Sequence, residues 1–357
     1  MPSNTCTAID IGSSYTKVVV GNNKKIKLCG LLKTPEGSVA NNNIMDVDAI
    51  AKALKAFMNE NKINNSDAYF AIHGQDLVVR HLEIPMMNVK AIRHAVEYEI
   101  NQYLPEDGAN HYIDYEIVEK INTPEKKAYK LLVVAAPKAK VNKYIELARA
   151  MNMNVKAIDI SSNCATRVFK EKEKYDPAVK KSTGIIDIGY NTSNIIILEN
   201  GKLFIEREIN FGISNIIREI ALFLNIDNNQ AYQYLFEKFS FNDTDDGSGI
   251  HKRVLSLFDE GLSRFEKVIQ FYTTGRIEKN IPSQVVLTSL SYADGTIQVS
   301  AASSDYEAIC VFSANLQTSD DFTGSIINSI TKGTDAGYTT SITISLGGGA
   351  ADEGTKQ

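Results

Sequence analysis

The chain has no excess of positive charge and no close pair of cysteines. Its 38 lysine and arginine residues are outnumbered by 43 aspartate and glutamate residues, and its formal net charge is −5. It therefore lacks the overall basic field that nucleic-acid binding usually requires, and we expect no nucleic-acid partner. Its four cysteines lie far apart without a Cys-x-x-Cys pair, so neither a zinc site nor a disulfide framework is indicated, and a reducing compartment fits best.

The sequence also lacks long apolar runs. The longest, such as residues 131–137, are far shorter than the roughly 20 residues that cross a bilayer, and the N-terminus has no signal-peptide pattern. We therefore expect no membrane span in this chain. Apolar residues still make up 43% of the sequence, which is enough for about two or three folded domains with their own cores.

The first 280 residues alternate β-branched runs with amphipathic stretches, a pattern that predicts strands covered by helices and hence an α/β architecture. A helix is predicted from Val89, because Ile92, Val96 and Ile100 follow it at helical spacing. Residues 128–160 have the pattern of a strand, a helix and a second strand. We expect residues from about 85 to 160 to form a small inserted unit.

The composition changes near Ile281. Residues 281–357 contain two of the 38 basic residues, eight of the 43 acidic residues and 22 serines and threonines, so this tail carries −6 and the preceding part +1. We predict a separate module over 281–346 with β-β-α-β order, in which a small sheet carries a helix on one face, and a flexible tail over 347–357. Nine apolar residues are expected to form the core of the module: Val285, Leu287, Ile297, Val299, Ile309, Phe312, Leu316, Ile342 and Ile344.

Residues 6–20, CTAIDIGSSYTKVVV, place Asp10 at the end of an apolar run, before Gly12 and a second apolar run. The pattern returns 177 residues later with Asp187 and Gly189. One strand, turn and strand of this kind is common as a purely structural element. Two matched copies instead indicate an internally duplicated domain whose two hairpins serve one ligand.

The residues of both turns suit an anion. Glycine lets the backbone turn sharply, so that the following N–H groups can point into one concavity. Asp10 and Asp187 are predicted to face each other within about 10 Å, as acceptors for the water shell of a bound Mg²⁺. The predicted donors to phosphate oxygens are Ser13, Ser14, Thr16 and Lys17 in the first hairpin and Asn191, Thr192 and Ser193 in the second.

Several segments, in this order, resemble the PilM family, the actin-like component of bacterial type IV pilus assembly. They are AIDIGSSYTKVV, AVEYEINQYLP, the run over 131–160, IIDIGYNTSNIII and INFGISNIIREIALFLNID. The resemblance covers residues from about 5 to 280, and the small inserted unit separates PilM and its relative FtsA from the sugar kinases and heat-shock ATPases of the superfamily. Residues 281–346 are similar to the C-terminal globular domain of PilN.

This resemblance implies a duplicated, ribonuclease H-like actin fold with an inserted subdomain, followed by an α+β ferredoxin-like module. It implies a scaffold rather than an enzyme, with ATP and Mg²⁺ as cofactors, Gly212 as a further nucleotide-binding residue, and Asp10 and Asp187 holding the metal through water. The implied partners are PilN-like, PilO-like, platform or motor components of the inner-membrane machine, together with self-association. The implied location is the cytoplasmic face of the inner membrane, although the PilN domain lies outside that membrane in its relatives.

The chain departs from the PilM pattern in two places. It passes from Asn280 directly to the PilN-like module, without the strand and glycine-rich turn that contact adenosine in PilM and without the peptide, transmembrane helix and coiled segment of PilN. Tyr232, Gln233 and Leu235 replace the charged groups that usually reach the ribose. We therefore expect weakened nucleotide binding and a fusion from which internal segments have been removed.

The sequence leaves two other functions open. An ATPase or kinase of the same superfamily would need a general base near the γ-phosphate, for which Asp187 is the only good candidate. An FtsA-like protein would instead form filaments. The inserted unit is predicted to bind proteins, because its first helix has a charged outer face and the unit has no glycine hinge.

Overall fold

The structure is a computed structural model. It describes residues 5–22, 24–64, 66–104, 108–172, 182–242, 249–293, 296–318, 324–333 and 337–345. The flexible tail expected at 347–357 lies outside these residues. None of the helices in these ranges is both long enough and apolar enough to cross a membrane.

The chain divides into two compact units, residues 1–261 and 262–357. The division falls inside one long helix, α7 (Ile250–Glu278). The end of α7 belongs to the second unit because Ile277 is fully buried in the core of that unit. The sequence composition predicted this boundary near Ile281 instead. The composition changes there, but Ile277, which precedes it, is already part of the core of the second unit.

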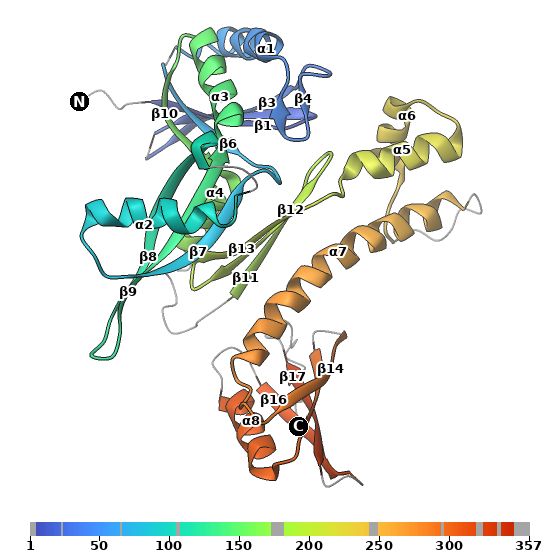
Figure 1. The fold of residues 1–357 in the computed structure, drawn as a ribbon. Helices are drawn as coiled ribbons and strands as arrows, with labels where there is room; N and C mark the ends of the chain where they lie inside the picture. Colours follow the sequence, from blue (N-terminus) through green and yellow to red (C-terminus); the bar gives the residue numbers. More distant parts are fainter. Residues whose placement is uncertain are drawn as a thin grey trace, which may run out of the picture. The chain divides into compact units, whose positions relative to one another are not determined.

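A five-stranded sheet opens the first unit in the order β10-β6-β1-β2-β3 (Figure 1). Its strands are β1 (Cys6–Ile11), β2 (Tyr15–Gly21), β3 (Ile26–Lys33), β6 (Asp67–Ile72) and β10 (Asn154–Ile160). The first three strands are antiparallel neighbours, whereas β6 and β10 join in parallel. Helices α1 (Val47–Glu60) and α3 (Lys138–Ala150) bury Leu54 and Leu147 in the core beneath this sheet.

A second, three-stranded sheet has the order β7-β9-β8. It is built from β7 (Val78–Pro85), β8 (His111–Asn122) and β9 (Lys127–Pro137), with a 3-10 turn, η1 (Gly108–Asn110), before β8. Helix α2 (Val89–Asn101) covers it and begins where the Asn88 side chain accepts a hydrogen bond from the Ala91 N–H at 2.9 Å. Ile92, Val96 and Ile100 of α2 are fully buried, which confirms the helix predicted from Val89.

The expected inserted unit of about 85–160 differs from this sheet at both ends. The sheet already includes β7, and the last part of the expected unit, α3 and β10, belongs to the first sheet. β10 pairs in parallel with β6, and Tyr144 and Leu147 of α3 are buried in the first core. A strand, helix, strand pattern is local, and it does not determine which sheet each strand joins.

The second half of this unit carries the antiparallel sheet β11-β12-β13. Its elements are α4 (Ser161–Lys172), β11 (Ser182–Ile188), β12 (Ser193–Glu199), β13 (Lys202–Ile209), α5 (Ile213–Leu224), α6 (Asn228–Gln233) and a short π-helix, η3 (Tyr234–Lys238). β11 and β12 pair in the register of β1 and β2, since Asp187 lies opposite Asn194 as Asp10 lies opposite Lys17. The structure therefore repeats the hairpin as the sequence predicted.

The second unit is an antiparallel sheet in the order β14-β15-β17-β16 with α8 on one face. Its elements are β14 (Val286–Ala293), β15 (Thr296–Ser303), α8 (Tyr306–Thr318), β16 (Gly324–Lys332) and β17 (Tyr338–Ser345). Together with the end of α7, this order and pairing give a ferredoxin-like module that is entered at a helix.

The predicted core of the module is confirmed: eight of the nine residues are buried, and Leu287 packs against them partly exposed. The β-β-α-β prediction was wrong in omitting β16. This strand shifts register between Ile327 and Ser329, and the irregularity breaks the alternation of apolar and polar residues by which strands are recognised.

Candidate functional site

The first hairpin is held by hydrogen bonds of its own. The Gly12 N–H donates to the Tyr15 carbonyl at 3.1 Å, and a Cβ atom on Gly12 would lie 2.7 Å from that oxygen, so no other residue fits without a shift. Thr34 donates from its hydroxyl to the Gly12 carbonyl at 2.8 Å. Because the Thr34 proton is used there, Thr16 is the donor in the 2.9 Å contact between the two threonine hydroxyls.

Asp10 and Lys17 face each other across this hairpin. Lys17 Nζ donates to Asp10 Oδ2 at 2.8 Å. The other carboxylate oxygen, Oδ1, is buried and has no hydrogen-bond partner among the residues that the structure describes. An ionised carboxylate oxygen withdrawn from water without a partner is costly, so this atom marks a position where a donor such as a metal-bound water fits.

Two groups connect the acids of both hairpins electrostatically. Burial alone would lower the pKa of Lys17, but its ion pair with Asp10 and the charge of Asp187 outweigh that effect and raise it. Burial lowers the pKa of His73, against the charges of Asp10 and Asp187. Both carboxylates therefore act on the same two side chains; the separation predicted between Asp10 and Asp187 stays a prediction.

The second hairpin repeats the first with different side chains. A Cβ on Gly189 would collide with the Thr192 carbonyl, as one on Gly12 would with Tyr15. Ser193, the counterpart of Thr16, donates from its buried hydroxyl to the Phe211 carbonyl at 2.7 Å. The position of Lys17 is taken by the mostly buried Asn194, so this hairpin brings no ammonium group.

Two of the predicted phosphate donors therefore have another role in this structure. The hydroxyl protons of Thr16 and Ser193 go to Thr34 and to the Phe211 carbonyl, which lie outside the two hairpins, and both side chains are buried. These hydrogen bonds stabilise the turns, and the predicted contact of both hydroxyls with phosphate stays a prediction. Ser13, Ser14, Asn191 and Thr192 remain as the polar side chains of the turns, as the sequence analysis expected, and their contact with phosphate stays a prediction.

Gly212 is the N-terminal cap of α5 and lies against the second hairpin. The N–H groups of Ile213 and Ser214 donate to the carbonyls of Gly189 and Tyr190 at 3.1 and 2.8 Å. A Cβ on Gly212 would collide with the Tyr190 carbonyl, which explains the glycine. The helix start is thus fixed to the turn at the position that the resemblance implied for a nucleotide-binding residue.

Three tyrosines meet near the turns. Tyr15 and Tyr190 belong to the two hairpins, and Tyr232 lies on α6, where the family resemblance placed the ribose contacts. Burial raises the pKa of Tyr232, and its hydrogen bond with Tyr15 and the proximity of Tyr190 raise it further. The Tyr232 ring also packs on Phe236 with centroids 4.5 Å apart. An aromatic group thus stands at one of the positions where the resemblance implies charged ribose ligands, and the weaker affinity remains an expectation.

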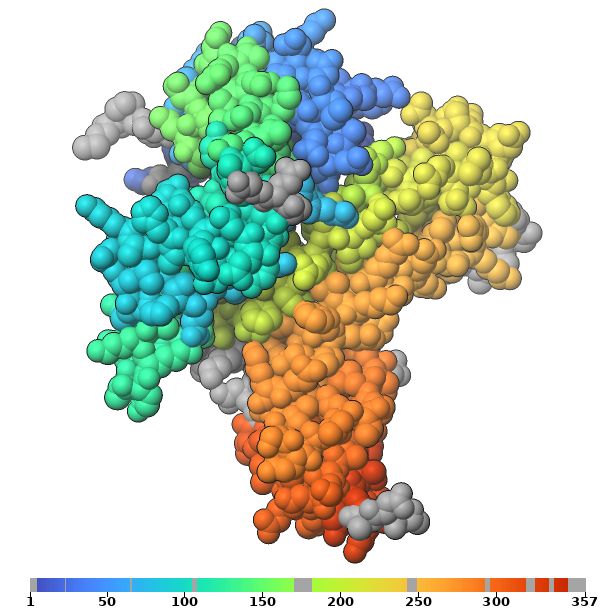
Figure 2. All heavy atoms as spheres, viewed as in Figure 1, coloured from blue at the N-terminus to red at the C-terminus, as the bar shows by residue number. Residues whose placement is uncertain are grey.

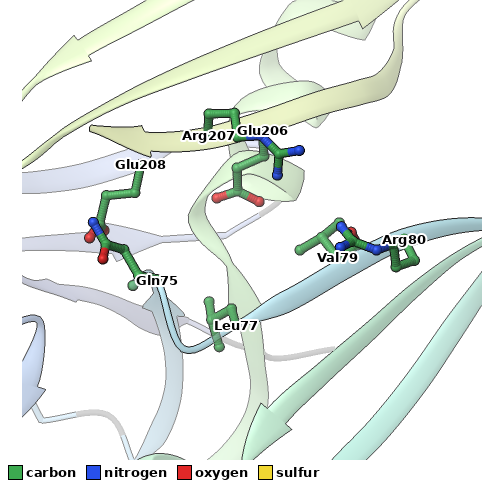
Figure 3. Close-up of a pocket in the computed structure, with 8 residues that line it drawn as sticks. Gln75, Leu77, Val79, Arg80, Glu206, Arg207 and Glu208 are labelled. Carbon is green, nitrogen blue, oxygen red and sulfur yellow. The ribbon is translucent and has the colours of Figure 1, made fainter. Parts of the chain in front are cut away.

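A pocket of about 220 Å³ lies between β13 and the segment that leads into β7 (Figure 3). Glu206 and Glu208 on β13 face Gln75 and Leu77 across it (Figure 3). Burial raises the pKa of both glutamates, although Glu206 accepts a hydrogen bond from Ser162 at 2.6 Å.

Sequence reasoning missed the buried cation beside this pocket. Lys140 on α3 has a side chain that is 1% exposed, and its Nζ donates to Asp76 Oδ1 at 2.6 Å and to the His73 carbonyl at 2.7 Å. A lysine in an amphipathic helix gives no signal of such burial. Asn42 was missed too; it lies in a run of three asparagines that indicates a turn but not what the turn reaches.

Comparison with models of known protein families shows which family the chain belongs to. The model of the family described as "Type IV pilus assembly protein PilM" matches residues 8–298. The chain belongs to the PilM family. A second family, "Fimbrial assembly protein (PilN)", matches residues 275–346. The expected PilM-like chain with a PilN-like C-terminal module is thereby confirmed, and with it a part in type IV pilus assembly.

Several solved structures are similar to this chain, to different degrees. A "PilM-PilN type IV pilus biogenesis complex" is 17% identical, covers 76% of this chain and 79% of its own, and has a TM-score of 0.64. This similarity confirms the expected actin-like PilM fold. The ethanolamine utilization protein EutJ from Carboxydothermus hydrogenoformans (10% identity, 77% and 73% coverage) and MreB 5 of Spiroplasma citri bound to AMPPNP (10%, 75% and 79%) each give a TM-score of 0.44.

Proposed function

We propose that the chain is a nucleotide-responsive scaffold of the type IV pilus platform, which holds the phosphates of Mg-ATP between its two hairpins and acts through protein contacts. The observation that carries the nucleotide part is the buried, unpartnered Oδ1 of Asp10 beside Lys17. Asp10 and Asp187 would take the water shell of Mg²⁺, and Lys17 would exchange its ion pair for a phosphate oxygen.

Calorimetric titration with Mg-ATP tests this part. Lys17→Met should weaken binding by about tenfold to a hundredfold, because a hydrogen bond between charged groups is lost. Lys27→Met is the matched control, since Lys27 is an exposed lysine on β3 that contacts Thr5. Failure of the native chain to bind Mg-ATP, or equal binding by the Lys17 and Lys27 variants, would contradict the proposal.

We propose binding without catalytic turnover as the working state. Asp187, the candidate base of the ATPase alternative, lies on β11 and is exposed to solvent. Phosphate release measured with excess Mg-ATP should stay far below the order of 1 per second. Faster release that Asp187→Asn abolishes would establish the enzyme instead.

Contacts with other pilus proteins are proposed for the surface formed by α2 and β8, which lies on the outside of the first unit (Figure 2). A groove of about 630 Å³ runs beside β8 and is lined by apolar and charged groups, among them Tyr112, Asp159 and Arg167. Val89 and Tyr98 of α2 are also largely exposed. Apolar exposure framed by charges is typical of protein-binding surfaces.

A PilN-type protein is the proposed first partner, because a solved relative is a PilM–PilN complex. Val89→Asp combined with Tyr112→Asp should abolish co-purification with PilN-type and PilO-type components of the inner-membrane platform. Ile26→Asp is the control, because Ile26 on β3 is an apolar residue whose exposure lies between those of Val89 and Tyr112. Mg-ATP binding should be unchanged in all these variants, and a parallel loss of nucleotide affinity would contradict a separate protein-binding role.

The PilN module is proposed to associate through its outer strands, β14 and β16, either with itself or with a PilO-like domain. Residues 262–357 should fold and sediment as a dimer or bind such a domain. The shorter piece 281–357 lacks Ile277 and should be less stable by about 2 kcal/mol, the value of one buried aliphatic side chain. Denaturation followed by circular dichroism compares the two pieces, and equal stability would remove Ile277 from the module.

A further inference from the structure

Asn42 lies at the tip of a tight hairpin formed by β4 (Val39–Ala40) and β5 (Asn43–Ile44). The two loop residues, Asn41 and Asn42, both have positive φ, at 48° and 59°. A two-residue loop of this kind is a type I′ turn, which asparagine tolerates and which has little freedom to deform. The turn therefore presents the Asn42 side chain in a fixed place.

The Asn42 side chain reaches the second hairpin, 150 residues further along the chain. Its Nδ2 donates one proton to Thr192 Oγ1 at 3.1 Å and the other to Glu208 Oε2 at 2.7 Å, and the residue is only 8% exposed. The carboxylate oxygen of Glu208 accepts, so the NH₂ group of Asn42, and not its carbonyl, must face this side.

This arrangement fixes the role of the Thr192 hydroxyl. A hydroxyl has one proton to donate and lone pairs that accept. Because Thr192 Oγ1 accepts from Asn42, its own proton is directed elsewhere. The Thr192 carbonyl also lies against Gly189, so Thr192 belongs to the turn proposed to bind phosphate.

We propose that Asn42 is a positioning residue for the phosphate site: it orients the Thr192 hydroxyl as a donor to a phosphate oxygen. Glu208 in turn orients Asn42, and the buried Lys140 acts electrostatically on Glu208. This inference rests on the proposed nucleotide site. It adds a residue of the first half, Asn42, to the function of the second hairpin, although Asn42 belongs to neither hairpin motif.

Asn42→Gly tests the proposal with little risk to folding, because glycine adopts the positive φ of the turn without strain. Asn41→Gly alters the same turn at the neighbouring residue and is the matched control. Mg-ATP affinity should fall about fivefold to tenfold in Asn42→Gly, the effect of one hydrogen bond, and should stay unchanged in Asn41→Gly. In a Thr192→Val background, Asn42→Gly should cause no further loss. A loss that persists in that background, or no loss at all, would overturn the proposal.

A variant with reversed donors and acceptors tests whether Asn42 orients the Thr192 hydroxyl or only links the two segments by hydrogen bonds. In the double variant Asn42→Asp, Glu208→Gln, the amide of residue 208 can donate to the new carboxylate, and the Thr192 proton must turn toward residue 42. The bridge is kept, but the donor to phosphate is lost, so affinity should remain reduced. Recovery of the native affinity would show that Asn42 only bridges the two hairpins, and would overturn the proposal.

Hydrogen exchange of the nucleotide-free chain keeps this inference separate from the proposed function. Amides of residues 189–193 should exchange faster in Asn42→Gly than in the native chain, and at the native rate in Asn41→Gly. Unchanged exchange in Asn42→Gly would overturn the role of Asn42 itself. A native chain that binds no Mg-ATP while Asn42→Gly still loosens the turn would overturn the nucleotide site and, with it, the phosphate donor role of Thr192.

Discussion

The two halves of the first unit share a hairpin but differ in what surrounds it. β1 is the middle strand of a five-stranded sheet, with β2 on one side and β6 on the other, whereas β11 pairs in the described part of the chain with β12 alone. Ile9 is accordingly 1% exposed, and Ile186, the residue at the same position of the repeat, is 43% exposed. The same local sequence therefore has a different burial in each half.

The difference separates what a hairpin needs from what a phosphate site needs. In both turns a glycine lies against a backbone carbonyl. Each hairpin also has a buried hydroxyl, of Thr16 or Ser193, that donates a hydrogen bond to a residue of its own half of the unit. Only the first turn has an ammonium group paired with its acid, because Asn194 stands where Lys17 would be. We infer that the geometry of the turns is duplicated, while the positive charge proposed to bind phosphate is concentrated in the first half.

The largest effect is expected in stability. Ile9→Ala should lower the free energy of unfolding of the first unit by about 2–5 kcal/mol, because it opens a cavity between packed strands. Ile186→Ala, the matched change in the exposed copy, should cost less than about 1 kcal/mol. Urea denaturation followed by circular dichroism measures both, and equal losses would mean that β11 is as well covered as β1.

The second effect concerns the two acids. Asp10→Asn should weaken Mg-ATP binding by about tenfold or more, since it removes the half-buried negative charge opposite Lys17. Asp187→Asn should change affinity by less than about threefold, because the exposed carboxylate is screened by water. Calorimetric titration at several Mg²⁺ concentrations distinguishes the two. A larger loss at Asp187 would reverse the assignment of charge to the first half.

The third pair of changes should give equal effects. Gly12→Ala and Gly189→Ala each force a Cβ against a carbonyl of their own turn, and each should cost about 1–2 kcal/mol of stability. Thermal unfolding of both variants tests whether the turns share one geometry. If Gly189→Ala were tolerated, the second turn would be able to relax where the first cannot.

The smallest effect is a pH dependence that belongs to the first half. His73 follows β6 and is faced by Asp10 and Asp187, and by Lys17 and Lys140; burial lowers its pKa from 6.5. Between the lowered value and 6.5 the unfolded chain binds more protons than the folded chain, so stability is lost as the pH falls below about 6.5. His73→Asn should remove this loss in pH-dependent thermal unfolding. A profile that does not change would show that another group titrates.

The sequence by itself determined the elements whose signals are local. The two Asp-x-Gly turns, the helix from Val89 and the buried core of the PilN module follow from turn chemistry and from apolar spacing, which neighbouring residues encode. The irregular strand β16 escaped detection because its register shift breaks that spacing. Family resemblance added the actin-like fold, which no single segment specifies.

Only the tertiary structure decided which chemical groups meet. β10 joined β6 rather than the small sheet, Lys140 was buried against Asp76, and Asn42 reached Thr192 across 150 residues. The hydroxyls of Thr16 and Ser193 support their turns through hydrogen bonds to Thr34 and Phe211, each 18 residues away in the sequence. Hydrogen bonds and burial depend on contacts between segments that are distant in the sequence. The spacing of apolar residues, every second residue in a strand or every 3.6 residues in a helix, encodes which face of an element is apolar. It does not encode which other segment that face packs against.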